Sequence, residues 1–339
     1  MPVISDVPMR MRLTTIGAAG IAAALSLLTA RPAAAINCQA AATRQEKAIC
    51  ADPAAKSADA RMADAFAALR SQTPEAERDA LASDQRHWIT TRNDSCSYDP
   101  DGKELAGAAL SACLAKQSEQ RRLFLSGLPA DGPGLAGAIR PFFIKGRDGR
   151  VISGLRFTAP QSAGERLFNS AVERQLKTVN VAQGRDGDPT DGFAMTLRYA
   201  SPALISAEVV ISYPSSAHPV DHHDNINIDL GAGKPLTFDA IFRHDARDAL
   251  MTKCRPQLDG FIGEAAKADL DDNDMRESIM KDRETLVRAS IADISRWSLD
   301  SRELTLTIDD EAASRITSTC RLEAAEVKPL MQPRFELAR

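Results

Sequence analysis

"INCQAAATRQEKAIC" (residues 36–50) carries two cysteines, Cys38 and Cys50, directly after an apolar leader. Such a pair can serve as a lipid anchor, a metal site, a redox pair or a covalent staple for a small domain. Lipidation of Cys38 needs a small residue before it, and Asn37 stands there instead. The chain that follows is rich in alanine, so its helices bury little apolar area, and a disulfide staple fits best.

Residues 1–35 have the layout of a secretory signal peptide. A basic flank precedes an apolar run over residues 13–28, and an Ala-x-Ala cleavage site ends at Ala35. We expect cleavage between Ala35 and Ile36, which gives a periplasmic or secreted protein that is not lipidated and retains no membrane segment. A retained anchor is the alternative, but the run is short for a bilayer span.

Composition disfavours several classes of function. The 339 residues include 42 Lys and Arg against 46 Asp and Glu, a net charge of −4. The sequence has no cluster of basic residues that would indicate binding to nucleic acid. A mildly acidic surface suits a basic partner. The sequence has no nucleophile elbow, zincin helix or comparable catalytic motif, so we expect neither an enzyme nor a cofactor. It does not predict the oligomeric state.

Residues 36–126 predict a small all-α bundle. Thr43 and Glu46 form a capping box, in which each side chain accepts a backbone N–H of the other residue. Asp52 followed by Pro53 is a second helix start, and apolar residues follow it at i, i+4 and i+7. Two further helices are expected over residues 74–92 and 103–125.

The cysteines are expected to pair in an oxidising compartment. Four of the six lie in the helical half: Cys38, Cys50, Cys96 and Cys113. We favour Cys38–Cys50 and Cys96–Cys113, although four cysteines allow three pairings. A bridge that closes so short a loop contributes about 3 kcal/mol in the chain-entropy model. Cys254 and Cys320 are left to pair with each other.

Residues 127–138 read as a linker, and residues 139–339 predict an α+β domain with a mostly antiparallel sheet. Alternating apolar residues and a Gly-Ala-Gly turn predict a hairpin over residues 225–238. The other strands are expected over 139–144, 151–157, 193–199, 204–213, about 287–297 and 304–308. Helices are expected over 164–179 and from Thr237 or Asp239 to about Leu258.

"SSAHPVDHHDN" (residues 215–225) crowds three of the five histidines beside two aspartates. Imidazole and carboxylate suit zinc or similar ions, so a metal-dependent enzyme centred on His218, His222 and His223 is one hypothesis. Pro219 breaks the helical frame that a metal helix needs, so a polar loop between strands is favoured. "GRDGDPTDG" (184–192) and "DLDDNDMRE" (269–277) depart from calcium-loop patterns and read as acidic turns.

The order of motifs in the first half resembles the LprI-type lysozyme inhibitors. The matching stretches are "EKAIC", "DP" and "QRHWITTRNDSC", followed by a last cysteine. They contain the family-motif residues Glu46, Asp52, Gln85, Trp88 and Arg92. We expect these residues to be structural, in helix caps, in the core or in hydrogen bonds between helices.

The second half resembles the extracellular domain of RsiV-type anti-sigma factors, through "SSAHPVDHHDNINIDLGAGKPLTFDAIF" (residues 215–242). Both families are associated with lysozyme, one as inhibitors and the other as sensors. The resemblances therefore imply an exported protein that binds and inhibits lysozyme-type cell-wall hydrolases. The alternatives are a peptidoglycan- or glycan-binding module without inhibitor activity, and the metal-dependent periplasmic enzyme.

An inhibitor commonly inserts an exposed loop into the cleft of its target. We therefore expect the partner contacts in the polar loops of the two halves. The residues are Tyr98, Asp99 and Asp101 in the first half, and His218, Asp221 and His222 in the second.

Overall fold

The structure is a computed structural model that describes residues 35–99, 101–135, 137–145, 151–182, 192–213, 220–264, 273–310 and 316–333. These ranges all belong to one compact unit, Ala33–Arg339. None of the helices they form is both long and apolar enough to cross a membrane.

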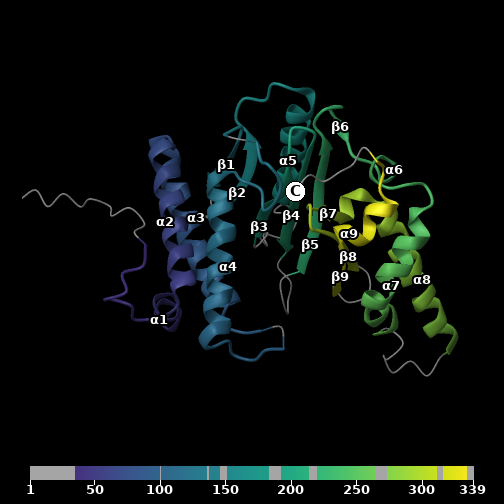
Figure 1. Ribbon diagram of the computed structural model, residues 1–339, viewed down its shortest axis with the longest axis horizontal. Coiled ribbons are helices and arrows are strands. Elements are labelled where there is room, and N and C mark those ends of the chain that lie inside the picture. Colours follow the sequence, from purple (N-terminus) through teal and green to yellow (C-terminus); the bar gives the residue numbers. More distant parts are fainter. Residues whose placement is uncertain are drawn as a thin grey trace, which may run out of the picture. The chain divides into compact units, whose positions relative to one another are not determined.

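Four helices open the described chain (Figure 1): α1 (Arg44–Ala51), α2 (Pro53–Gln72), α3 (Glu75–Ser95) and α4 (Gly107–Ser126). The predicted starts of α1 and α2 are correct, since the Thr43 capping box and the Asp52 cap both form. Helix α4 begins later than expected because the chain after Cys96 first makes a hairpin. It ends at Gly127, whose φ of +63° favours glycine and where a Cβ would collide with the Ile139 carbonyl.

The helical region has a thin core in two parts. One is built around Met62, Phe66 and Leu81, and the other around Ile49, Leu110 and the fully buried Cys96. The disulfides Cys38–Cys50 and Cys96–Cys113 join α1 to the segment before it and α3 to α4. These are the pairings that the sequence favours, and they add covalent links where the apolar area is small.

A hairpin of β1 (Ile139–Lys145) and β2 (Val151–Phe157) follows the helices. Phe143 of β1 belongs to the same apolar cluster as Phe66 and Leu81 of the helical region. Its ring meets that of Phe124 of α4 edge-on, with 6.3 Å between the centroids. The hairpin therefore completes part of the helical core.

The central sheet is antiparallel, in the order β3 (Gly192–Ala200), β4 (Leu204–Tyr213), β5 (Val220–Asp229) and β6 (Lys234–Pro235). The amphipathic helix α5 (Ala163–Ala182) packs against it, and Phe168 lies in the shared core. The expected strands over 193–199 and 204–213 and the hairpin over 225–238 agree with this arrangement.

A third sheet consists of β7 (Trp297–Leu299), β8 (Glu303–Asp310) and β9 (Ile316–Glu323), again antiparallel. Trp297 is fully buried in a large core that these strands share with the helices around them. Cys254–Cys320 joins α7 to β9. The helices are α6 (Phe238–Ile241), α7 (Ala246–Glu264), α8 (Asn273–Ala292), η1 (Ile294–Arg296), α9 (Ala324–Val327) and η2 (Lys328–Leu330).

Two predicted elements are wrong. The helix expected through Leu258 is interrupted after Ile241, because Phe242 adopts an extended conformation and pairs with Met331. The strand expected over residues 287–297 is mostly helix α8, and only its last residue begins a strand. The apolar positions 286, 287, 291 and 294 repeat with a helical period, which outweighs the β-branched side chains among them.

Candidate functional site

The chain between α3 and α4 folds into a small hairpin, the 97–106 hairpin, of which Pro100 lies outside the described residues. Tyr98 pairs with Glu104 in an antiparallel bridge, and the Asp99 N–H donates to the Lys103 carbonyl at 2.8 Å. The Asp99 carboxylate accepts the N–H of Lys103 at 2.8 Å and that of Asp101 at 3.1 Å. These bonds fix the turn, so Asp99 shapes the hairpin and leaves its neighbours to face outward.

Two attachments hold the hairpin on the helices. The Cys96–Cys113 disulfide closes its base between α3 and α4. From α1, Arg44 forms an ion pair with Glu104, and Gln45 donates to the Ser97 hydroxyl at 3.3 Å. A loop held at base and side loses little conformational entropy when a partner binds it.

The hairpin presents an aromatic ring among charges. Tyr98 is 60% exposed, the highest value among the large apolar side chains that the structure describes. Asp101, Lys103 and Glu104 are exposed beside it in sequence. A tyrosine offers a large contact area with few rotatable bonds, which suits insertion into a cleft of a partner protein.

Buried ion pairs link helices α2, α3 and α4. Arg92 of α3 donates to Asp59 of α2 at 3.0 Å and to the Ser118 hydroxyl of α4 at 3.3 Å. Arg121 of α4 pairs with Asp84 of α3, and both side chains are buried. Burial lowers the pKa of Arg121, and the charge of Asp84 opposes that shift.

Trp88 lies between these two ion pairs. The guanidinium carbon of Arg92 lies 5.1 Å from the ring centroid and that of Arg121 lies 5.5 Å from it, which are cation–π distances. The Gln85 amide oxygen accepts from Arg121 at 3.0 Å. Through these contacts Gln85, Trp88 and Arg92 of α3 connect this helix to α2 and α4.

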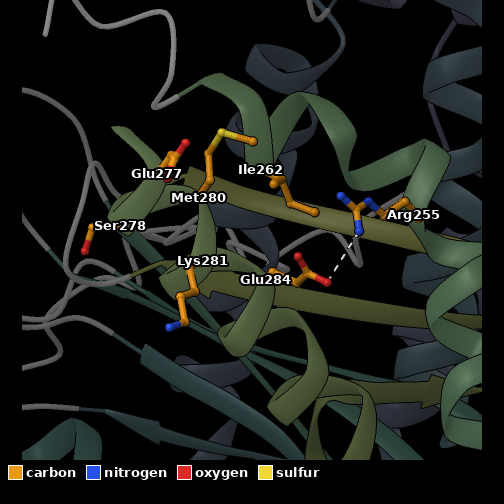
Figure 2. A pocket seen from close by; sticks show the side chains of 7 residues that line it. All are labelled: Arg255, Ile262, Glu277, Ser278, Met280, Lys281 and Glu284. Carbon is orange, nitrogen blue, oxygen red and sulfur yellow. Dashed lines mark hydrogen bonds and ion pairs between the residues drawn. The ribbon is translucent and has the colours of Figure 1, made fainter. Parts of the chain in front are cut away.

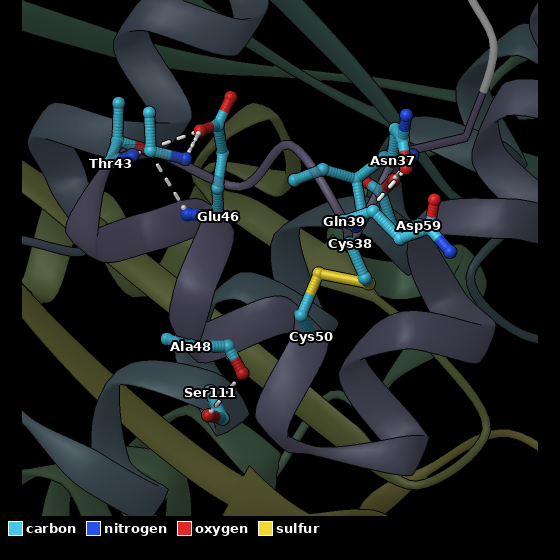
Figure 3. Close-up of a disulfide and its surroundings, with 11 residues drawn as sticks. Asn37, Cys38, Gln39, Thr43, Glu46, Ala48, Cys50, Asp59 and Ser111 are labelled. Carbon is cyan, nitrogen blue, oxygen red and sulfur yellow. Dashed lines mark hydrogen bonds between the residues drawn. A yellow bond between two sulfur atoms is a disulfide. The ribbon is translucent and has the colours of Figure 1, made fainter.

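The remaining motif residues cap helices. The Glu46 carboxylate accepts the backbone N–H groups of Thr43 and Ala42, and these bonds lower its pKa. Figure 3 shows this box beside the Cys38–Cys50 disulfide. Asp52 accepts the N–H of Ala55 at 2.9 Å at the start of α2.

In the second half, Asp221 and His222 lie on strand β5, so the expectation that they belong to a loop is wrong. Strand β5 pairs with β4 along its whole length, so Asp221 and His222 lie opposite Ser212 and Ile211 of β4. Asp221 accepts from the Ser212 hydroxyl at 2.6 Å, and His222 Nδ1 lies 3.7 Å from Asp309 Oδ2. His218 lies outside the described residues.

His223 belongs to a network of ion pairs between β3, β4, β5 and β8. Its Nδ1 lies 3.6 Å from Glu208 Oε1, and its backbone N–H donates to Asp309 Oδ2 at 2.7 Å. Arg198 also binds Glu208, and Arg296 lies 3.3 Å from Asp309. The interaction with Glu208 raises the pKa of His223 despite its partial burial. Burial alone would raise the pKa of Glu208, but His223 and Arg198 lower it.

This network joins the central sheet to the sheet of β7, β8 and β9. Over the described ranges, no group of three or more His, Cys, Asp or Glu side chains is placed to hold a metal ion. The calcium-like stretch over 184–192 lies outside the described residues except for Gly192, which begins β3. Of the stretch over 269–277, the described part forms the first turn of α8.

A cavity between α7 and α8, which the sequence does not reveal, has a volume of about 660 Å³ (Figure 2). Arg255 and Glu284 form a 3.4 Å ion pair on its wall, and Ile262 and Met280 supply apolar surface. Its other lining residues are Glu277, Ser278 and Lys281. Its lining residues come from two helices that are separate in sequence, so no local motif marks this cavity.

Comparison with known proteins gives a match for the helical region. Residues 37–125 match the model of a protein family described as lysozyme inhibitor LprI. The matched segment contains the four helices except the last residue of α4, both of their disulfides and the 97–106 hairpin. A search of curated proteins finds no match.

Two solved structures are similar to the larger part of the chain. One is a member of the DUF3298 family from Bacteroides fragilis, with 12% identity, a TM-score of 0.35, and coverage of 58% of this chain and 94% of that one. The other is a DUF3298 family protein from Pseudomonas aeruginosa, with 14% identity, a TM-score of 0.37, and coverage of 59% and 95%.

Proposed function

We propose that this chain is an exported, non-enzymatic protein that binds lysozyme-type cell-wall hydrolases and inhibits them. The observation that carries the proposal is the match of residues 37–125 to the lysozyme inhibitor LprI family. Three disulfides, with no free cysteine among the described residues, fit an oxidising compartment outside the cytoplasm.

The 97–106 hairpin is the contact that we propose within the matched segment. It is preformed by its own hydrogen bonds, by Cys96–Cys113 and by Arg44. Glycoside hydrolases act in a groove whose catalytic carboxylates flank the scissile bond, so an inserted aromatic side chain can exclude substrate without reacting. The carboxylate of the exposed Asp101 suits a basic rim around such a groove.

The test is a titration of hen-type and goose-type lysozymes with the oxidised protein, in which binding and cell-wall lysis are both measured. Micromolar or tighter binding with loss of lysis is the expected result. Binding without loss of lysis would instead indicate a sensor or scavenger. Retention on peptidoglycan with no lysozyme binding would favour the glycan-binding alternative.

For the second half, we propose an RsiV-type domain over residues 139–339 that supplies a second lysozyme-binding surface. The support is the sequence pattern over residues 215–242. Asp221 and His222, near one end of β5, are the described residues of the proposed contact. The paired substitutions Asp221→Asn and His222→Gln should weaken binding of lysozyme while leaving the 97–106 hairpin intact. Unchanged affinity would confine the interaction to the helical region.

A further inference from the structure

The segment before α1 is tied into the helical core by its backbone. The backbone nitrogen of Ile36 lies 3.2 Å from Asp59 Oδ2 and donates to it. The Ile36 side chain packs against the apolar cluster that contains Ile49 and Leu114. Ala35, one residue earlier, is exposed. Ile36 thus marks the point where the chain enters the folded structure.

The acceptor is a buried carboxylate that already has one cationic partner. Asp59 is 5% exposed, and its other oxygen, Oδ1, accepts from Arg92 at 3.0 Å. Taking a carboxylate out of water is costly unless strong donors satisfy both of its oxygens. An amide N–H is a neutral donor, and an ammonium group at the same place would form a stronger, charge-assisted bond.

The sequence predicts a reaction that would convert the amide nitrogen of Ile36 into an ammonium group. Its Ala-x-Ala site predicts cleavage of the bond between Ala35 and Ile36 by the peptidase that removes export signals. Hydrolysis adds one water across this bond, which leaves a carboxylate on Ala35 and an ammonium group on Ile36. The new group is the same nitrogen atom that lies next to Asp59.

We propose that removal of the leader creates an ion pair between the α-ammonium group of Ile36 and Asp59, so that the processed N-terminus becomes a structural part of the helical bundle. Only a chain that begins at residue 36 places its terminal charge at this oxygen. Cleavage therefore stabilises the fold that later carries the 97–106 hairpin. This inference does not depend on the lysozyme proposal.

The surroundings favour the charged form of the terminus. The nitrogen of Ile36 contacts Oδ2 of the Asp59 carboxylate, which comes from α2. Arg92 from α3 donates to the other oxygen of that carboxylate, Oδ1. Helix α1 contributes the apolar Ile49, and α4 contributes the Ser118 hydroxyl to Arg92. Cys38, two residues after Ile36, is bonded to Cys50, so the terminus is held near α1 (Figure 3).

The first experiment is N-terminal sequencing of the full chain after export to the periplasm, which should begin at Ile36. Two oxidised forms are then prepared by removing a cleavable tag: one begins at Ile36 and the other begins at Ala33. Unfolding is measured from pH 6 to pH 10. At pH 6 to 7 the longer form should have an unfolding constant at least about threefold larger, as for a partly exposed ion pair.

The stability difference between the two forms should change with pH in one direction only. An α-amine has a pKa of about 7.7–8.0 in peptides, and a neighbouring carboxylate raises it in the folded state. The advantage of the Ile36 form should therefore be complete below about pH 7.5 and disappear as pH rises through the folded pKa. The form that begins at Ala33 serves as the matched control and should lack this dependence.

Asp59→Asn in both forms should abolish the difference between them. If that variant does not fold, NMR titration of the α-amine in a chain labelled at Ile36 replaces it, and a pKa above the peptide range supports the ion pair. A natural N-terminus elsewhere, equal stability of the two forms at every pH, or a peptide-like α-amine pKa would each overturn the proposal.

Discussion

At the level of single residues, Tyr98 is the side chain whose exposure calls for a function. Burying a tyrosine is favourable, and a fold that keeps one 60% exposed on a braced hairpin gives up that stabilisation. Truncating the ring should therefore change binding of the partner with little effect on folding.

We expect Tyr98→Ala to weaken lysozyme binding at least about tenfold, as for an aromatic anchor at the centre of an interface. Isothermal titration against the unmodified protein measures the change. Ile144→Ala is the matched control, because Ile144 is also exposed (47%) but lies on β1. Equal effects of the two substitutions would contradict the assignment of the hairpin as the contact.

The pair formed by His223 and Glu208 predicts a pH dependence of stability. The pKa of His223 is raised, so its contribution is present below the unfolded value of about 6.5 and is lost as pH rises through the folded value. The pKa of Glu208 is lowered, so its contribution is lost as pH falls below about 4.5.

His223→Gln should therefore reduce the free energy of unfolding more at pH 5.5 than at pH 8.5, as measured by urea denaturation at both values. His244→Gln is the control, since His244 lies outside this network, in the turn before α7. A penalty that is the same at both pH values would show that His223 acts through packing alone.

At the level of elements, the Cys96–Cys113 bridge connects the stability of α3 and α4 to the shape of the hairpin between them. Replacing both cysteines with serine should destabilise the fold by about 3 kcal/mol in the chain-entropy model. It should also weaken lysozyme binding, because the hairpin must then be ordered when it binds.

Thermal unfolding and lysozyme titration measure the two effects. The double serine replacement of Cys254 and Cys320 is the control, since it removes a bridge between α7 and β9. That variant should lose stability and retain affinity. If both double variants lose affinity equally, the bridge has no specific role in the hairpin.

The starts of helices are predicted correctly from the sequence where the capping interactions involve only neighbouring residues. The caps at Thr43 and Asp52 depend on neighbouring residues alone, and both form. The break after Ile241 depends on Phe242 pairing with Met331, which is distant in sequence, so no local pattern marks it. The same holds for the cavity between α7 and α8 and for the ion pairs around Trp88, whose partners come from separate helices.

At the level of the whole molecule, the helical and sheet-containing regions share apolar side chains. The sequence predicts a linker over residues 127–138, yet Phe143 of β1 completes the cluster of the helical region. Alternation in a strand reveals which residues are buried but not which element covers them. This is why the sequence could identify both regions and could not predict their packing.

Phe143→Ala should accordingly destabilise the helical region, by about 3–5 kcal/mol if the cavity does not collapse. Hydrogen exchange of amides in α2 and α3 measures the loss residue by residue. Phe142→Ala, one position earlier and in the cluster of the central sheet, is the control and should affect that sheet instead. Unchanged exchange in α2 and α3 would show that the helical region is independent.

Each of the three bridges joins a cysteine to the next one along the chain: first to second, third to fourth and fifth to sixth. A chain that enters an oxidising space N-terminus first exposes these residues in that order. Pairing each arriving thiol with the one that preceded it therefore produces the native set without reshuffling. Such a protein can mature with a simple thiol oxidase and has little need of a disulfide isomerase.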